Sequence, residues 1–225
     1  MHTDRTEEED DVSDSKRSRT EADTAGEDAT MTTTNPSPME IDEDLHSRQL
    51  AVYGRDSFRK LAGASVLIVG ARGLGIEIAK NVVLAGVKRV SVWDEGACGG
   101  EDLASQFYAT EQDAASKNVV RSVASVSKLQ ELNPAVDCVA HRGDALSEDV
   151  IAAHGVVVCT ETSEAEAKRV DEICRRVGSA FIKADIRGVF GSVFCDFGQG
   201  FNVVDVDGEE ALTCIVASVS NDSPA

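Results

Sequence analysis

The sequence predicts an α/β protein: a Rossmann-like, mostly parallel sheet with helices on both faces, followed by the start of a small β-rich domain. Three observations predict this fold. Short β-branched runs alternate with segments of helical period between residues 65 and 182. The first run ends in Gly70-Ala-Arg-Gly-Leu-Gly75, a glycine-rich turn placed where a strand passes into a helix. Beyond Val189, strand-like segments follow one another without helices.

The elements are expected in a simple order. A helix begins with Asp44 as its cap and stops at Gly54, and a second short helix contains Phe58 and Leu61. The βαβ alternation then predicts strands at 65–69, 87–93, 136–139, 155–159 and 180–182, with helices at 73–85, 117–132 and 164–177. The later strands are expected at 189–197, 201–206 and 212–219, pairing antiparallel where a new domain begins.

The acidic charge is concentrated at the N-terminus. The chain of 225 residues has a net charge of −18, and residues 1–44 contain fifteen acidic against four basic side chains. Because residues 1–43 hold almost no large apolar side chains, they cannot bury enough surface to offset the entropy of ordering. We expect a disordered acidic tail there.

The composition also excludes several classes of protein. An acidic chain repels phosphate backbones, so no nucleic-acid partner is expected. The sequence has neither a membrane-spanning run nor a secretory signal, which predicts an intracellular protein without a membrane partner. The cysteines lack metal-ligand or CxxC spacing and are expected to be reduced core thiols, with Cys98 the one loop thiol and the histidines on the surface or in linkers.

The glycine turn and a following carboxylate are the candidate nucleotide residues. Gly70, Gly73 and Gly75 open a helix whose free N–H groups attract phosphate, and Asp94 ends the next strand, where a carboxylate meets ribose hydroxyls. Arg72, however, replaces the glycine that lets a backbone approach a pyrophosphate. The pair fits a dinucleotide enzyme as readily as an adenylating one. Alternatively, the glycines only permit a tight strand-to-helix crossing, and Asp94 is a solvated strand end.

Several further segments together resemble the first half of ubiquitin-activating enzymes. In chain order they are Leu45-His-Ser-Arg-Gln-Leu50, the glycine turn, Glu77-Ile-Ala-Lys-Asn81, Ala85-Gly-Val-Lys88, Ser105-Gln-Phe-Tyr108, Ala184-Asp-Ile-Arg-Gly188 and Phe194-Cys-Asp-Phe-Gly198. Their order and spacing cover nearly everything after Asp44. The resemblance implies one of two adenylation halves of common ancestry, of which only the second activates ubiquitin with ATP and magnesium.

The resemblance further implies that this half is inactive and holds neither a catalytic residue nor a metal. Active halves carry an arginine where this chain has Ser105, and a magnesium-holding aspartate where it has Glu161 followed by Thr162. Any one of Lys117, Arg121 and Lys128 could correspond to the family's catalytic lysine, and the spacing does not assign the position to one of them. ATP and magnesium are therefore expected mainly in the absent active half.

Arg48 is the exception, because its counterpart in the family lies on an N-terminal helix and reaches the ATP phosphates of the active half. The resemblance thus implies an arginine finger acting in trans. On the residues alone, Arg48 is equally a polar side chain of an amphipathic helix, solvated or paired with Asp44.

The expected organisation is an acidic tail at 1–43, an inactive adenylation domain at 44–213, and the truncated start of the first catalytic-cysteine half-domain at 214–225. Expected partners are the active half and, through the full-length protein, ubiquitin and ubiquitin-conjugating enzymes, in the cytoplasm and nucleus. Three alternatives remain open: the small subunit of a SUMO-type activator, an NAD-dependent oxidoreductase, and a scaffold that contacts no nucleotide.

Overall fold

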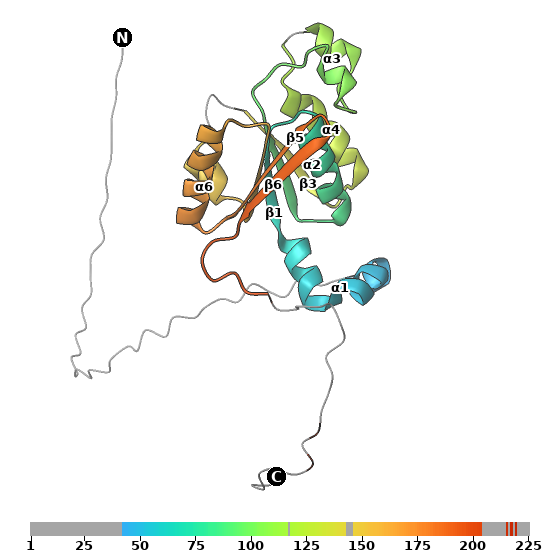
Figure 1. Ribbon diagram of the computed structural model, residues 1–225. Coiled ribbons are helices and arrows are strands. Elements are labelled where there is room, and N and C mark those ends of the chain that lie inside the picture. The colour runs from blue at the N-terminus through green and yellow to red at the C-terminus, as the bar shows by residue number, and fades with distance from the viewer. Residues whose placement is uncertain are drawn as a thin grey trace, which may run out of the picture. The chain divides into compact units, whose positions relative to one another are not determined.

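A computed structural model describes residues 42–116, 118–142 and 146–203, together with 215, 217 and 219. The expected acidic tail, the strand at 212–219 and the domain boundary at 213 lie wholly or mostly outside the described residues. The described part of the chain forms a six-stranded sheet with helices on both faces (Figure 1). The predicted α/β, mostly parallel fold is confirmed.

The sheet has the strand order β3-β2-β1-β4-β5-β6. The first five strands run parallel, and β6 pairs antiparallel with β5. The strands are β1 (Ser65–Val69), β2 (Arg89–Trp93), β3 (Asp137–His141), β4 (Val156–Thr160), β5 (Ala180–Arg187) and β6 (Phe190–Asp196). The helices are α1 (Glu43–Gly63), α2 (Gly73–Ala85), α3 (Glu111–Ser116), α4 (Arg121–Leu132), α5 (Glu148–Ala152) and α6 (Glu164–Val177), with a 3-10 turn η1 (Asp102–Ala104).

Two apolar layers hold the sheet between the helices. On one face, Ile76 and Val83 of α2 and Leu129 of α4 pack against the sheet, and the second half of α1 adds Leu61. On the other face, α6 and α5 cover the sheet, with Ile151 and Val170 buried. The central strands β1 and β4 are buried on both faces, which explains why they are continuous apolar runs.

Helix α6 shows how local sequence sets an element's bounds. The Ser163 side chain caps its first turn by accepting a hydrogen bond from Glu166 N, and Gly178 ends it in the left-handed conformation. Acidic residues occupy its first turn and basic residues its last, which complements the helix dipole.

Three details differ from the sequence expectations. The cap of α1 is Asp42 rather than Asp44, because the Asp42 carboxylate accepts the N–H of Leu45. The short helices α3 and α5 lack a long apolar period and were not expected. Strand β6 extends the same sheet instead of opening a new one, since β5 is longer than expected and pairs along its length with β6.

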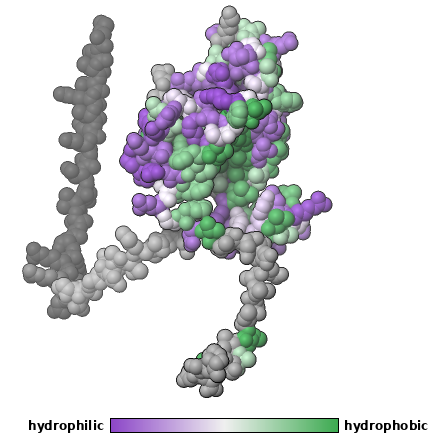
Figure 2. Space-filling model, viewed as in Figure 1, coloured by the Kyte–Doolittle hydropathy of each residue, from purple (hydrophilic) through white to green (hydrophobic). Residues whose placement is uncertain are grey.

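Strand β6 forms the outer edge of the described sheet and is exposed along nearly its whole length. Apolar side chains gather around it, and Figure 2 shows such a band on the viewed face. The exposed members near this edge are Ile186, Val189, Phe190, Val193, Phe194 and Phe197, which we call the β6 patch. A patch of this kind is typical of an interaction surface.

Candidate functional site

The glycine turn, Asp94 and the end of β4 meet at the carboxyl edge of the parallel strands, where ligands bind in doubly wound folds. A cavity of about 400 Å³ lies there. Its walls are Val69, Gly70, Arg72, Trp93, Asp94, Arg121, Thr160, Glu161, Thr162 and Arg187. The structure thus brings Gly70 and Asp94 together as expected, whereas Arg48 lies on α1, outside these walls.

The glycines are required by close packing inside the protein. A Cβ on Gly70, which has a φ of 101°, would lie 2.5 Å from the carbonyl oxygen of Thr160. A Cβ on Gly73 would lie 2.6 Å from the carbonyl oxygen of Ser105, and one on Gly75 would overlap the Gly70 carbonyl. The turn is therefore tight because neighbouring backbone fills the space beside it.

Asp94 is not the solvated strand end that the sequence allowed. It is buried, and its Oδ2 accepts hydrogen bonds from Ala71 N at 2.7 Å and Arg121 Nε at 3.1 Å. Its Oδ1 accepts from Gly96 N at 2.7 Å. Both carboxylate oxygens are thus engaged by the chain itself.

Arg121, one of the three basic candidates near the catalytic-lysine position, forms a buried network that the sequence did not indicate. Besides Asp94, its guanidinium donates from Nη1 to the Ala97 carbonyl at 3.1 Å and to Asp102 Oδ2 at 3.4 Å. Asp102 is itself buried and accepts from Gly99 N at 2.9 Å. This network joins the segment after β2 to the start of α4. Its partners are 19 to 27 residues apart, a separation that no local sequence pattern reports.

The other two basic candidates near the catalytic-lysine position do not enter this network. Lys128 is exposed and pairs with Glu131 at 3.0 Å. Lys117 lies outside the described residues.

Two oppositely charged side chains of the cavity wall, Arg72 and Glu161, lie beside each other. Arg72 Nε lies 3.6 Å from Glu161 Oε2. Glu161 is also the one described non-glycine residue with a positive φ, 55°, and its N–H donates to Asp185 Oδ1. The carboxylate that the resemblance compares with the magnesium-holding aspartate therefore meets a guanidinium.

These residues do not fit a magnesium nucleotide. Magnesium at nucleotide sites is held by one or two carboxylates together with water and phosphate oxygens. Of the two carboxylates that line this cavity, Glu161 faces the guanidinium of Arg72, and Asp94 has too little free capacity for the two hydroxyls of a ribose.

Arg48 lies on the first half of α1 and is exposed. The alternative ion pair with Asp44 does not form between these two described residues; instead, Asp44 accepts a hydrogen bond from the Ser47 hydroxyl through its backbone carbonyl. Leu45 and Val52 lie near Arg48 on the helix and are about three-quarters exposed. One face of this helix is thus apolar around a single guanidinium.

Most of the described cysteines, and His154, are at least partly buried. Burial raises the pKa of Cys159 to about 12 and that of Cys174 to about 11, which disfavours the thiolate that a nucleophile needs. Cys98 is buried rather than exposed in its loop, and Cys195, on β6, is the exposed exception to the expected core thiols. His154 was expected at the surface but is buried, and its Nε2 lies 2.7 Å from Ser91 Oγ.

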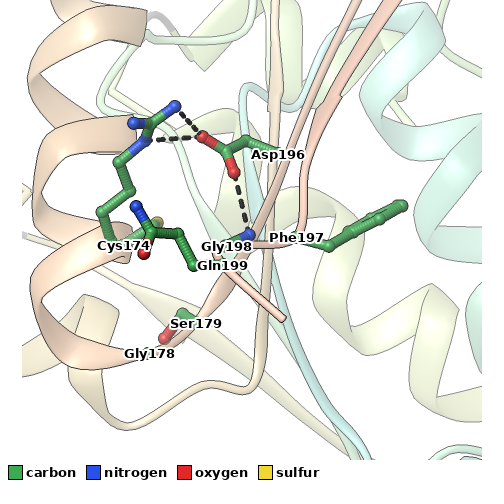
Figure 3. A pocket seen from close by; sticks show the side chains of 8 residues that line it. Cys174, Gly178, Ser179, Asp196, Phe197, Gly198 and Gln199 are labelled. Atoms are coloured by element: carbon green, nitrogen blue, oxygen red, sulfur yellow. Dashed lines mark hydrogen bonds and ion pairs between the residues drawn. The ribbon is translucent and has the colours of Figure 1, made fainter. Parts of the chain in front are cut away.

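A larger cavity, of about 580 Å³, lies at the end of the sheet away from the glycine turn. It is found between the end of α6 and the turn after β6 (Figure 3). There Asp196 accepts hydrogen bonds from Arg175 Nε at 2.6 Å and Gly198 N at 2.8 Å. In Figure 3, Asp196 joins the Arg175 guanidinium to the backbone N–H of Gly198, and these contacts fix the turn at which the chain leaves the sheet. The candidate site remains the glycine-turn edge.

Fold and site together define a Rossmann-like α/β chain in which four charged side chains of the cavity at the carboxyl edge form ion pairs within the chain: Arg72, Asp94, Arg121 and Glu161. Residues 46–219 match the ThiF family model, so the chain belongs to the ThiF family. No helix of the described residues is long and apolar enough to cross a bilayer.

Curated relatives of the chain include a ubiquitin-activating enzyme and a ubiquitin-like modifier-activating enzyme. The chain is 53% identical over 192 residues to ubiquitin-activating enzyme E1 2 of Arabidopsis thaliana and 44% identical over 190 residues to ubiquitin-like modifier-activating enzyme 1 of Homo sapiens. Each match covers 84% of this chain and 18% of the relative, so the chain spans less than a fifth of their length.

A solved structure shares the fold. The crystal structure of Escherichia coli MccB with succinimide aligns with a TM-score of 0.53 at 18% identity, covering 62% of this chain and 44% of that one. At this identity the likeness shows the fold alone.

Proposed function

We propose that this chain is the inactive adenylation half of a ubiquitin-activating enzyme and supports ATP-dependent adenylation and thioester activation of ubiquitin by an active half. The observation that carries the proposal is the engagement of Asp94 by Ala71, Gly96 and Arg121. A carboxylate whose oxygens are occupied in this way cannot also receive both hydroxyls of a ribose. The 53% identity to the Arabidopsis enzyme supports the choice of ubiquitin activation over other ThiF-type functions.

The charges at this edge also argue against adenylation by the chain itself. Attack of a carboxylate on the α-phosphate builds negative charge, which a metal ion and nearby cations must stabilise. Here Ser105 is uncharged, and Glu161 and Arg72 neutralise each other. We therefore assign the chain a binding and positioning role.

Within this role, Arg48 contacts the ATP phosphates held by the active half. A guanidinium suits this task because its planar donors match phosphate oxygens. Its exposure, beside the exposed Leu45 and Val52, is what a helix face that another domain covers would show. ATP and magnesium thus belong to the active half, and this chain supplies one side chain to them.

The partners follow from the same proposal. The active half would cover apolar surface that the described residues leave exposed, and ubiquitin and ubiquitin-conjugating enzymes would be met by the full-length protein. Such a role places the chain in the cytoplasm and nucleus.

A chimera tests the proposal. This chain replaces the matching N-terminal part of the Arabidopsis relative, and ubiquitin-dependent ATP–pyrophosphate exchange is measured. The chimera should be active, and Arg48→Ala should raise the KM for ATP about tenfold, the size expected for one charge-assisted contact to phosphate. Arg59→Ala, on the same helix but paired with Asp56, is the matched control and should change little.

Two results would redirect the assignment. If Arg48→Ala leaves the exchange unchanged, the chain acts as a scaffold without nucleotide contact. Tight binding of NAD to the chain in a fluorescence titration would favour the oxidoreductase alternative instead.

A further inference from the structure

Helix α1 bends sharply at Gly54. This residue has φ 73° and ψ 164°, whereas the rest of α1 is helical. That combination belongs to a region of backbone space that is essentially restricted to glycine. Figure 1 shows the two halves of α1 running in different directions. We call residues 43–53 the arm and Gly54 the elbow.

Two side-chain contacts cross the elbow and show how far the arm folds back. Arg55 Nη1 lies 2.6 Å from Glu43 Oε1, and the rings of His46 and Phe58 have centroids 4.8 Å apart. The members of each pair are 12 residues apart in sequence, which in a straight helix would separate their Cα atoms by about 18 Å. Both contacts therefore depend on the bend.

The inner face of the arm is held against the body of the protein. Gln49 Nε2 donates to the carbonyl oxygen of Ala85, at the end of α2, at 3.5 Å. Gln49 also lies 3.0 Å from His46 through Oε1, and His46 in turn contacts Phe58, which is buried. The half-buried residues His46, Gln49 and Leu50 repeat at helical spacing and form this inner face.

The outer face carries Arg48. Leu45, Arg48 and Val52 lie about a third of a turn around the helix from the inner residues and are all exposed. The direction of this face depends on the angle at the elbow and on the contacts of the inner face just given.

We propose that Gly54 is a positioning residue for Arg48: its backbone conformation, together with the Gln49 contact to α2, fixes the direction in which the guanidinium is presented to the active half. This inference rests on the proposed role of Arg48. It adds that contact between Arg48 and the ATP phosphates depends on the backbone conformation at Gly54 as well as on the Arg48 side chain.

The test is a double-mutant cycle in the chimera described above. Gly54→Ala removes the conformation that the bend needs and should raise the KM for ATP about as much as Arg48→Ala does, roughly tenfold. Because Gly54 acts only through Arg48, the double variant should be no worse than Arg48→Ala alone. Gly63→Ala is the matched control: Gly63 lies in the last turn of the same helix, a Cβ there meets nothing within 4 Å, and the KM should stay unchanged.

A second variant and a measurement confined to the arm distinguish a local change at the elbow from misfolding of the whole chain. Gln49→Met leaves the backbone free but removes the contact to α2, and it should also raise the KM. In the isolated chain, hydrogen exchange at 43–53 should speed up in Gly54→Ala and Gln49→Met and stay unchanged at 65–69.

The outcomes separate this inference from the proposal beneath it. Additive effects of Arg48→Ala and Gly54→Ala, or an unchanged KM in Gly54→Ala, would overturn the positioning role while leaving Arg48 in place. An unchanged KM in Arg48→Ala would overturn both.

Discussion

The glycine-turn edge and the outer surface of the molecule are opposite in character. At the edge, buried polar groups bind one another: Asp94, Asp102, Arg121, Ser122, Ser125 and Thr160 each have partners within the protein. On the outside, the arm of α1 and the β6 patch leave large apolar side chains in solvent. The edge expected to bind a ligand keeps a cavity of about 400 Å³, but four of the charged side chains in its walls are paired with one another. The exposed apolar surface, by contrast, is not marked by local sequence patterns.

The contrast teaches which part of the fold carries function. The paired charges at the glycine-turn edge contribute to stability, since buried charges are costly unless paired. An exposed apolar surface does not stabilise the isolated chain, and it contributes favourable free energy only when a partner covers it. Substitutions in the two regions should therefore differ in kind.

The largest expected effect is at Arg121. Arg121→Met leaves Asp94 and Asp102 buried without their cation, which should lower the free energy of unfolding by about 3–5 kcal/mol. Urea unfolding followed by circular dichroism measures it. The matched control is Arg89→Met, whose partner Asp137 is half exposed, and it should cost at most about 1 kcal/mol. Equal costs for the two variants would mean that the edge is not the stabilising network described.

A smaller loss is expected at the glycine turn. Gly75→Ala forces a Cβ against the Gly70 carbonyl and should cost about 1–3 kcal/mol in the same unfolding experiment. Gly100→Ala, where a Cβ meets nothing within 4 Å, is the comparison. An unchanged free energy of unfolding in Gly75→Ala would show that the turn has room for a methyl group beside the Gly70 carbonyl.

The buried histidine should make stability depend on pH. Burial lowers the pKa of His154 from its ordinary 6.5, and the nearby His141 and Arg89 act in the same direction. The unfolded chain then binds the proton more tightly, so stability is lost as the pH falls through about 6.5 and below. His154→Gln should flatten the dependence of unfolding free energy on pH between 7 and 5. If the slope of unfolding free energy against pH is the same in the variant, groups other than His154 cause the pH dependence.

The smallest effect on stability is expected at the β6 patch. Val193→Lys places a charge on an exposed edge strand and should change the unfolding free energy by less than about 0.5 kcal/mol. It should nevertheless reduce self-association of the isolated chain, which light scattering measures, because charged side chains block edge-to-edge contact. If the variant self-associates as strongly as the parent chain, the β6 patch is not the surface through which the isolated chain associates.

Much of the fold could be predicted because its signals are local. The β-branched run at 65–69, the glycines at 70–75 and the capping residues of 164–177 each act on their own neighbours, and the structure follows them. Strand β6 was predicted to pair antiparallel but not to join the first sheet, since the length of β5 is decided by that pairing.

The sequence predicted where the candidate site lies, but not that its charged side chains pair with one another. Gly70 and Asp94 do lie together, because strand ends in a parallel sheet share an edge. The engagement of Asp94 by Arg121 and the pairing of Arg72 with Glu161 arise from residues 27 and 89 positions apart, and such contacts follow from the packed fold alone. The bend at Gly54 was predicted as a helix stop, yet the contacts that make it an elbow cross it in space.

One measurement tests the inactivity of the glycine-turn edge most directly: incubation of the purified chain with ATP, magnesium and ubiquitin, followed by mass spectrometry for a ubiquitin adenylate. No adenylate should form from the chain alone, and the adenylate should appear once an active half is supplied. An adenylate formed by the chain alone would show that this edge binds and activates a nucleotide despite the pairing of its charged side chains.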